Sequence, residues 1–195
     1  MYKFFYRSMH KINYEKYYFI SEYDTNLIKY QKKKTNIIFR NYKRKIDVVK
    51  ITILRDFCRK KGCHFFLSNN VKLAIKLKLD GVYLPSFNKN FNHLAYNLKP
   101  SFIILGSAHS YKELNIKEIQ KAKFIFLSSL FKKNKNYLGI YRFKLYENFT
   151  KKKVIALGGI NKNNIRKLRL LNISGFAGIS FFQKKGPSKR GPFNF

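Results

Sequence analysis

Short apolar runs alternate with longer mixed segments along most of the chain. The runs are bounded by polar or glycine positions, and they lack the polar alternation of a half-exposed strand. Such runs are typical of strands that are buried on both faces of a parallel sheet. The pattern predicts strands at 17–20, 36–39, 64–67, 81–84, 102–105, 124–127, 154–157 and 175–179.

The segments between these runs favour helices. In the clearest of them, residues 45–59, apolar positions recur at helical spacing, at Ile46, Val49, Ile53 and Phe57. Gly62 follows as the expected end of that helix. The same reasoning predicts helices at 71–79, 111–122, 143–149 and 163–171.

Alternation of strands and crossovers predicts the α/β class and a closed (β/α)8 TIM barrel, with an open doubly wound sheet as the alternative. The chain has 195 residues, close to the usual lower limit of about 200 for this barrel. Pro187 and Pro192 lie in the short remainder after the last strand, so we expect the last helix to be truncated or missing. We expect one domain over 1–195, with an N-terminal extension at 1–16 and an irregular tail at 181–195. The extension is a candidate cover for the exposed part of the barrel.

Charge is the most unusual property of the composition. Lys and Arg number 42 against 9 Asp and Glu, for a formal net charge of +33. Such a field attracts phosphorylated metabolites, nucleic acid or an anionic membrane surface. The basic residues are spread along the chain, and Lys, Asn, Ile, Phe and Tyr are all frequent, which favours compositional drift. We therefore expect no nucleic-acid partner, although charge alone leaves that class open. So few acids also disfavour a mechanism built on several carboxylates.

Cysteine content and targeting signals indicate the cellular compartment in which the protein is expected. Cys58 and Cys63 are too few for a disulfide framework and lack the repeated pairs of a zinc site. Residues 1–16 contain no apolar core of signal-peptide length, and no stretch approaches the roughly 18 apolar residues that span a bilayer. We expect a reduced, cytoplasmic protein without a membrane partner.

Residues at the carboxyl-terminal strand ends carry the chemistry of a barrel, and here they are mostly small or hydroxylic. The sharpest feature is the pair Gly158–Gly159 between a strand and a helix. Glycines let backbone N–H groups approach a ligand, and a helix N-terminus favours an anion. Ile179 and Ser180 end the following strand, so the two loops together predict a phosphate site. The alternative is an ordinary tight turn.

Two side chains are candidates for chemistry at the same end. His109, beside Ser107 and Ser110, is either a ligand contact or general acid/base, or a helix N-terminal residue with Ser110 as the cap. Arg40 ends an apolar strand, where a lone cation is costly unless it is paired with an anion. Because acids are scarce, we expect Arg40 to meet a substrate phosphate. His64, at the opposite end of its strand, is interpreted as structural.

Five segments, taken in order, resemble the thiamine-phosphate synthase / TenI family over roughly residues 17–182, in the short form of its alphaproteobacterial members. They are Phe-Arg-Asn-Tyr at 39–42, Asp-Gly-Val-Tyr-Leu-Pro at 80–85, Gly-Ser-Ala-His-Ser at 106–110, Leu-Ser-Ser-Leu-Phe at 127–131 and Ala-Leu-Gly-Gly-Ile at 156–160. The resemblance implies a (β/α)8 barrel of thiamine biosynthesis, a transferase. Synthases of this family join hydroxymethylpyrimidine diphosphate to hydroxyethylthiazole phosphate, which gives thiamine phosphate and pyrophosphate. Two alternatives stay open: a TenI-like thiazole phosphate isomerase, and an inert barrel that binds phosphates or nucleic acid.

The resemblance also implies residue roles. Gly159, Ile179 and Ser180 would bind the thiazole phosphate, while Arg40, Ser107 and His109 would act on the pyrimidine diphosphate side as the catalytic set. Further substrate contacts are expected at Tyr42, Asn69, Ser86, Ser128, Lys133, Lys135 and Gly158.

The chain departs from the family at the metal site. The family implies Mg²⁺ held by acids after the third and fourth strands, but these positions are Ser68–Asn69 and Asn88 here. Neutral amides are poor ligands for Mg²⁺, so weak binding is predicted and the metal ligands stay unknown. Lys132, Lys133 and Lys135 stand where the family has a Pro- and Thr-rich pyrophosphate loop. One hypothesis is that these cations replace part of the metal's charge. The alternative is a solvated run of charge.

Overall fold

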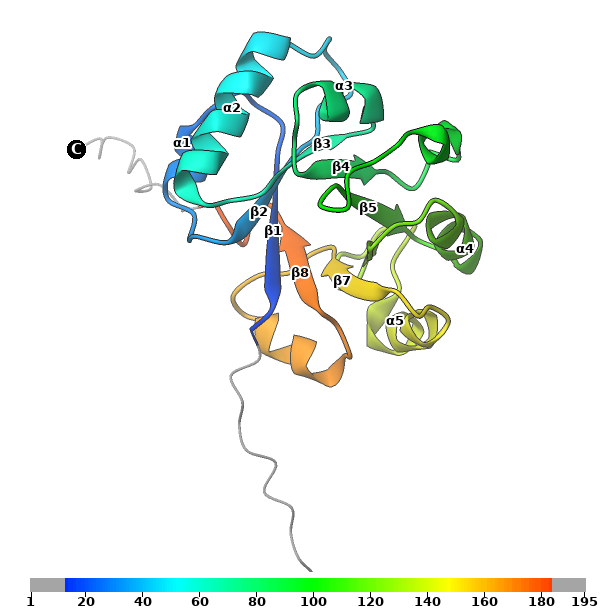
Figure 1. Cartoon of the computed structure of the whole chain (residues 1–195). Helices are drawn as coiled ribbons and strands as arrows, with labels where there is room; N and C mark the ends of the chain where they lie inside the picture. The colour runs from blue at the N-terminus through cyan, green and yellow to red at the C-terminus, as the bar shows by residue number, and fades with distance from the viewer. Residues whose placement is uncertain (1–12, 184–195) are drawn as a thin grey trace, which may run out of the picture.

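The strands of the chain close into one parallel barrel. The computed structural model describes residues 13–183 (Figure 1). Neighbouring strands pair in chain order, and β1 pairs with β8 to complete the ring. Closure confirms the (β/α)8 barrel and excludes the open sheet. The strands are β1 (Glu15–Ile20), β2 (Thr35–Phe39), β3 (Phe65–Ser68), β4 (Gly81–Leu84), β5 (Ile103–Ala108), β6 (Phe124–Leu127), β7 (Lys153–Leu157) and β8 (Gly175–Gly178).

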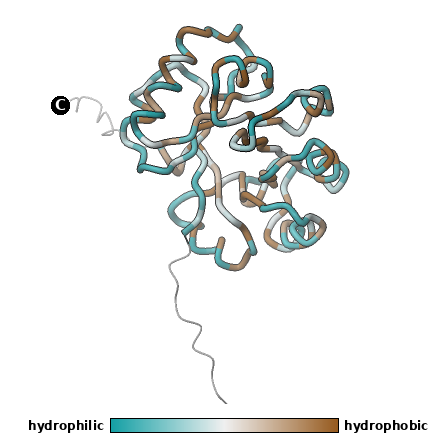
Figure 2. Tube along the Cα trace, in the orientation of Figure 1, coloured by the Kyte–Doolittle hydropathy of each residue, from teal (hydrophilic) through white to brown (hydrophobic). Residues whose placement is uncertain are grey.

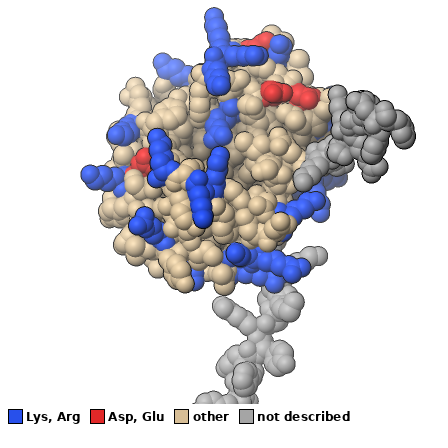
Figure 3. Space-filling view, turned by 180° about the vertical axis from the view of Figure 1, so that it is seen from behind, with Lys and Arg blue, Asp and Glu red and all other residues tan. Residues whose placement is uncertain are grey.

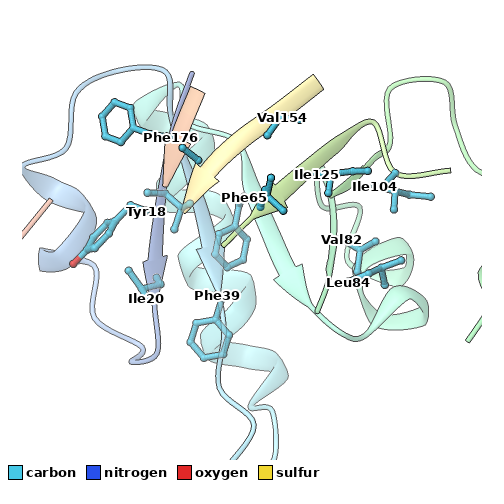
Figure 4. Close-up of a cluster of buried hydrophobic side chains, with 14 of the residues drawn as sticks. Tyr18, Ile20, Phe39, Phe65, Val82, Leu84, Ile104, Ile125, Val154 and Phe176 are labelled. Atoms are coloured by element: carbon cyan, nitrogen blue, oxygen red, sulfur yellow. The ribbon is translucent and has the colours of Figure 1, made fainter. Parts of the chain in front are cut away.

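Alternate residues of each strand point into the barrel and out toward the helices. In β1, Tyr17 and Phe19 belong to the interior cluster, while Tyr18 and Ile20 belong to the outer one. Figure 4 shows the outer cluster, to which every strand contributes. Both faces are therefore apolar, which is why the strands read as continuous apolar runs in the sequence.

Aromatic rings fill the barrel interior. Phe126 lies at the centre of this cluster, with ring centroids 4.9 Å from Tyr17, 5.4 Å from Tyr83 and 6.0 Å from Phe19. All three contacts are edge-to-face, the geometry that aromatic quadrupoles prefer. Below its mouth, by which we mean the carboxyl-terminal end of the strands, the barrel is therefore packed core and not a channel.

The helical segments form the outer layer of the barrel (Figure 1). Strands appear mostly apolar and the outer loops mostly hydrophilic in Figure 2. The segments are α1 (Asn26–Lys29), α2 (Val48–Lys61), α3 (Val71–Lys76), the 3-10 helix η1 (Asn92–Ala95), α4 (Tyr111–Ile119), α5 (Gly139–Asn148) and the 3-10 helix η2 (Ile165–Leu170).

The helix α2 forms as predicted, but its fully buried residues are not those whose spacing indicated it. The helix buries Ile51, Leu54 and Cys58, whereas Val49 and Ile53 are 69% and 54% exposed. Apolar residues stand on both faces of this helix, so their spacing alone does not select the buried one. Residues 45–47 are also not helical, because Asp47 caps the helix by accepting a hydrogen bond from the Lys50 amide at 3.1 Å. Gly62, with φ of 70°, ends the helix as predicted.

Several other boundaries differ from the predictions, and α3 and α4 each end three residues earlier than predicted, at Lys76 and Ile119. β5 continues to Ala108, so Ser107 belongs to a strand and not to a loop, and α5 begins at Gly139 instead of 143. The predicted helix at 163–171 is the shorter 3-10 helix η2. From β8 to the end of the described chain at Gln183 no helix forms, in agreement with the prediction for the last helix over that stretch.

The predicted terminal segments lie mostly outside the described residues. Residues 1–12 and 184–195 are not described, so the proposed cover by the N-terminal extension and most of the tail cannot be compared with the structure. β1 already begins at Glu15, two residues inside the segment assigned to the extension.

Positive charge on one face of the protein is scattered and is not gathered in one patch. Figure 3 shows Lys and Arg scattered over the whole of one face, with few acids among them. Within residues 13–183 the ion pairs are Lys50 with Asp47 and Arg55 with Asp56. No helix in this part of the chain is both long and apolar enough to cross a membrane.

Candidate functional site

Arg40 follows β2 directly and lies over an aromatic ring at the mouth. Its guanidinium carbon is 4.6 Å from the centroid of the Phe19 ring, and its side chain hydrogen-bonds to Tyr83. A π face and a phenol therefore hold this cation, which stays uncompensated by any ion pair among the described residues. Arg40 lines two adjoining cavities of about 130 and 740 Å³, and Glu22 lines both as well. The structure thus offers an unneutralised cation next to open space.

Tyr83 and Ser107 lie beneath Arg40. Both side chains are buried and hydrogen-bonded to each other, from neighbouring strands β4 and β5. Burial raises the pKa of Tyr83 to about 12, although the Ser107 hydrogen bond and the Arg40 charge act in the opposite direction. The phenol is therefore neutral at pH 7, and its oxygen accepts a hydrogen bond from the Arg40 guanidinium above it. Ser107 is thereby placed at the inner edge of the site.

Tyr42 extends the site from β2 to β3. Its hydroxyl lies 2.6 Å from Ser68 Oγ, and its ring meets Phe87 edge-to-face at 5.4 Å between centroids. Burial raises the pKa of the Tyr42 hydroxyl. The contact with Phe87 brings the loop after β4 beside the loop after β2, so the rim of the mouth is continuous there.

His109 is held in one tautomer by the end of β6. Its Nδ1 lies 2.9 Å from the backbone oxygen of Ser128 and 2.9 Å from Ser128 Oγ. A carbonyl oxygen only accepts, so Nδ1 carries the hydrogen and Nε2 is left as an acceptor. Ser110 also caps α4 by accepting from the Glu113 amide at 3.3 Å, so the capping prediction is confirmed. The structure therefore joins His109 to Ser128, and the functional and capping interpretations are compatible.

The loops after β3 and β4 meet through an amide pair. Asn88 Nδ2 donates to Asn69 Oδ1 at 2.6 Å, and Asn88 Oδ1 accepts from the Asn90 amide at 2.9 Å and from Gln120 Nε2 at 3.2 Å. Both amide oxygens are thus already engaged by donors. Ser86 lies half-buried in the same loop.

These donors do not fit the Mg²⁺ that the family resemblance implies. Mg²⁺ prefers carboxylate and phosphate oxygens plus water, whereas Asn69 and Asn88 are neutral and bonded to each other. Within residues 13–183 no group of three or more His, Cys, Asp or Glu side chains comes together. The protein's own residues therefore provide no built Mg²⁺ site at the ends of β3 and β4.

Gly158 and Gly159 are required by close packing of the β7 loop on the β6 loop. They have φ of 104° and 74°, and a Cβ at Gly159 would lie 2.6 Å from the Lys132 backbone nitrogen. The carbonyl of Gly158 accepts from the amide of Phe131 at 2.8 Å. The glycines therefore have a structural role that the sequence reasoning did not include, beside their predicted role in phosphate binding.

The phosphate site is predicted on two loops that the structure places next to each other. β7 pairs with β8, and Ser180 lines a cavity of about 570 Å³ together with Asn161 and Lys162. The helical segment expected here is the 3-10 helix η2, which begins at Ile165, two residues later than predicted. The backbone N–H groups of residues 163 and 164 already donate hydrogen bonds to Asn161 Oδ1, so they are not free to bind an anion. Anion binding at this place thus has to come from the β7 and β8 loops and from Lys162. Ile179 is 43% exposed beside them.

Lys133 and Lys135 are exposed in the loop between β6 and α5. The turn between them is organised by Asn134, whose side chain accepts from the Asn136 amide at 3.0 Å. The preceding residue, Lys132, packs its backbone against Gly159. The loop therefore runs beside the predicted phosphate site, while the two side chains extend into solvent.

A network of buried polar side chains was not predicted from the sequence. Lys117 of α4 and Gln120, the residue that follows the helix, are both fully buried and bond to the loop after β4. Lys117 shares a helix face with Leu114, three residues earlier, and this spacing was the available signal. In a chain with 42 basic residues one lysine at a core position does not stand out.

Comparisons with known proteins show the family to which the chain is similar. The family described as thiamine monophosphate synthase matches residues 27–182. The thiamine-phosphate synthase of Methanococcus vannielii is 28% identical over 60% of this chain and 58% of its own length. Those of Pyrococcus horikoshii and Helicobacter pylori are 29% and 30% identical, over 65% and 63% of this chain and 63% and 58% of their own lengths. The chain thus aligns with about 60% of the length of these curated relatives.

One solved structure is similar in both sequence and fold, and another in fold. The thiamine phosphate pyrophosphorylase of Pyrococcus furiosus superposes with a TM-score of 0.67 at 25% identity, covering 85% of each chain. A native KDPGal structure superposes with a TM-score of 0.64 at 12% identity, over 88% of this chain and 85% of that one. The second likeness concerns the fold alone.

Proposed function

Because the chain belongs to the thiamine monophosphate synthase family, we propose that it joins hydroxymethylpyrimidine diphosphate to hydroxyethylthiazole phosphate. The products are thiamine phosphate and pyrophosphate, which makes the protein a transferase. The bond between the pyrimidine methylene carbon and the diphosphate oxygen breaks, and the leaving diphosphate keeps the electron pair. The thiazole nitrogen then supplies the pair for the new C–N bond. Two anionic substrates must therefore lie side by side at the mouth.

The arrangement of the β7 and β8 loops is the observation that carries the proposal. Gly158–Gly159 and Ser180 end neighbouring strands, and Ser180 opens onto the 570 Å³ cavity beside Lys162. Backbone N–H groups in a glycine loop approach an anion closely, and Lys162 adds a positive charge. We assign the phosphate of the thiazole substrate to this place.

The pyrimidine diphosphate is assigned to the β2 side of the mouth, next to the β8 loop, because Arg40 and Ile179 line the same cavity. Arg40 is held there by the Phe19 ring and Tyr83, without a carboxylate partner among the described residues. A fixed cation stabilises the charge that develops on a leaving diphosphate, and it requires no reorganisation during the reaction. His109, which Ser128 holds at the end of β5, is assigned to the same substrate.

Further positive charge for the leaving group is assigned to Lys133 and Lys135. The side chains after β3 and β4 do not fit Mg²⁺, so the protein's own cations would form the site of the leaving group. The loop between β6 and α5, which carries both lysines and is called the lysine loop below, packs against Gly159. This contact brings the loop close to where the two substrates would meet. Flexible exposed lysines can close on a diphosphate once it is bound.

The proposal is tested by placing a negative charge at the predicted phosphate position. Ser180→Asp adds a carboxylate at an exposed residue that has room for it. Like charges about 4 Å apart repel by several kcal/mol near a protein surface, so we expect the KM for thiazole phosphate to rise at least about tenfold. The matched control is Ser101→Asp, an exposed serine before β5 at the opposite end of the barrel. Equal KM values for Ser180→Asp, Ser101→Asp and the wild type would refute the assignment.

A further inference from the structure

Lys117 is a fully buried lysine whose ammonium bonds to the loop after β4. It is 0% exposed, and Nζ donates to the backbone oxygens of Pro85 at 2.8 Å and Asn88 at 2.7 Å and to Gln120 Oε1 at 2.8 Å. Three acceptors match the three hydrogens of an ammonium group. None of these acceptors is charged, and a buried cation is costly without a strong set of partners. A core position of this kind would be more stable with an apolar residue unless the loop needs the lysine.

The strand beneath Lys117 is adapted to its side chain. A Cβ at Gly106 of β5 would lie 2.9 Å from Lys117 Cδ and 3.1 Å from Lys117 Cγ. The absence of a side chain at Gly106 therefore opens the passage through which the lysine stem crosses from α4 to the mouth. Glycine and lysine form a matched pair, one on the strand and one on the helix.

Gln120 reinforces the same attachment. Its side-chain amide is buried and donates to the Asn90 backbone oxygen at 2.8 Å and to both oxygens of Asn88 at 3.2 Å. Its own backbone oxygen lies 2.9 Å from Nε2 of His93, the buried histidine of η1. The segment from Pro85 to His93 is thus fastened to α4 at several points.

This fastened loop leads directly to the candidate site. Asn88 donates to Asn69 after β3, and Ser86 lies in the same loop. Phe87 of the loop packs against Tyr42, whose hydroxyl contacts Ser68. A shift of the loop after β4 would therefore displace the polar rim that β2, β3 and β4 form together.

We propose that Lys117 is a positioning residue that fixes the loop after β4, and through Asn88 and Asn69 sets the pyrimidine diphosphate half of the site. The inference rests on the proposed function for the identity of that substrate. It does not make Lys117 a catalytic residue, because the ammonium is buried and reaches the site only through the loop.

The contact between the Lys117 ammonium and the loop after β4 is also expected to depend on pH. Burial lowers the pKa of Lys117 to about 8, while Glu113 on the same helix acts in the opposite direction. The residues that face it from β5 and from the loop, Gly106, Pro85 and Asn88, are uncharged. Above that pH the neutral amine has two hydrogens for three acceptors, so the three contacts with Pro85, Asn88 and Gln120 can no longer all be made.

The test replaces the ammonium and keeps the volume, with Lys117→Met in the full chain. Its control is Lys112→Met, an exposed lysine on the same helix. Hydrogen exchange of the 85–93 segment is measured together with KM for each substrate. We expect Lys117→Met to speed exchange of that segment and to raise KM for the pyrimidine diphosphate, each at least about tenfold. KM for the thiazole phosphate and all values for Lys112→Met should stay at wild-type level.

The outcomes separate a positioning role from a structural one. Unchanged exchange, or faster exchange with an unchanged KM for the pyrimidine diphosphate, would overturn the proposal. If Lys117→Met does not fold, Lys117→Gln and the pH dependence of wild-type KM replace it, with KM for the pyrimidine diphosphate expected to rise above about pH 8. A flat KM in both would equally overturn it. Absence of turnover in the wild type would instead count against the proposed function, while the exchange of the loop is measured without any substrate.

Discussion

One added methyl group at Gly159 is predicted to destabilise the protein more than the same change at Gly62. The two glycines have nearly equal backbone conformations, with φ of 74° and 70°. A left-handed conformation costs an alanine roughly 1–2 kcal/mol at either position. Their surroundings differ, because a Cβ at Gly62 meets no atom within 4 Å, whereas at Gly159 it lies 2.6 Å from the backbone nitrogen of Lys132.

The extra cost at Gly159 follows from the rigidity of what it meets. The neighbouring atoms are backbone atoms of Phe131 and Lys132, which cannot rotate away as a side chain would. Overpacking of this kind costs roughly 1–3 kcal/mol, and a displaced β6 loop loses hydrogen bonds to Gly158 worth about 1 kcal/mol each. We expect Gly159→Ala to lose about 2 kcal/mol more unfolding free energy than Gly62→Ala.

Urea unfolding of both variants measures this difference directly, with unchanged m-values as the check that unfolding stays two-state. In thermal unfolding the difference corresponds to at least about 4 °C in Tm for a chain of this size. Equal losses in the two variants would refute the reasoning, because backbone strain alone would then explain both. Such a result would also mean that the packing of the β7 loop on the lysine loop does not determine the geometry of the site.

Three further predictions concern charge. Arg40→Met should lower kcat at least about 100-fold in a steady-state assay, since it removes a fixed cation, and the exposed Arg142→Met should not. Joint replacement of Lys133 and Lys135 by alanine should also lower kcat about 100-fold while calorimetry finds thiazole phosphate affinity unchanged; equal loss of affinity would contradict the assigned role. Burial raises the pKa of Glu147, so the unfolded chain ionises first as the pH rises and stability falls above that point. Glu147→Gln should therefore stabilise the protein by about 1 kcal/mol at pH 7, and by nothing below about pH 4, when chemical unfolding is followed against pH.

The strands were predictable because their signal is local. A strand buried on both faces appears as an apolar run, and residues such as Phe65 and Phe124 marked these runs clearly. The helices were less predictable, because α2 carries apolar side chains on its solvent face, with Val49 and Ile53 exposed. Periodicity does not reveal which of two apolar faces meets the barrel.

The candidate site was predictable only in its placement. The residues at the carboxyl-terminal strand ends, among them Arg40 and His109, follow from the order of strands in a barrel. The partners that orient them come from distant parts of the chain: Phe19 under Arg40, and Ser128 against His109. Such contacts depend on the closed barrel and on side-chain packing, so a local sequence pattern does not predict them. Lys117 belongs to the same class.

The central claim is tested most directly by turnover of the wild-type chain. The purified protein is incubated with hydroxymethylpyrimidine diphosphate and hydroxyethylthiazole phosphate, with and without added Mg²⁺, and the products are separated and quantified. We predict thiamine phosphate and pyrophosphate in equal amounts, with Ser180→Asp reducing both. Tight binding of thiazole phosphate without any thiamine phosphate, under either metal condition, would contradict the account and favour a TenI-like isomerase.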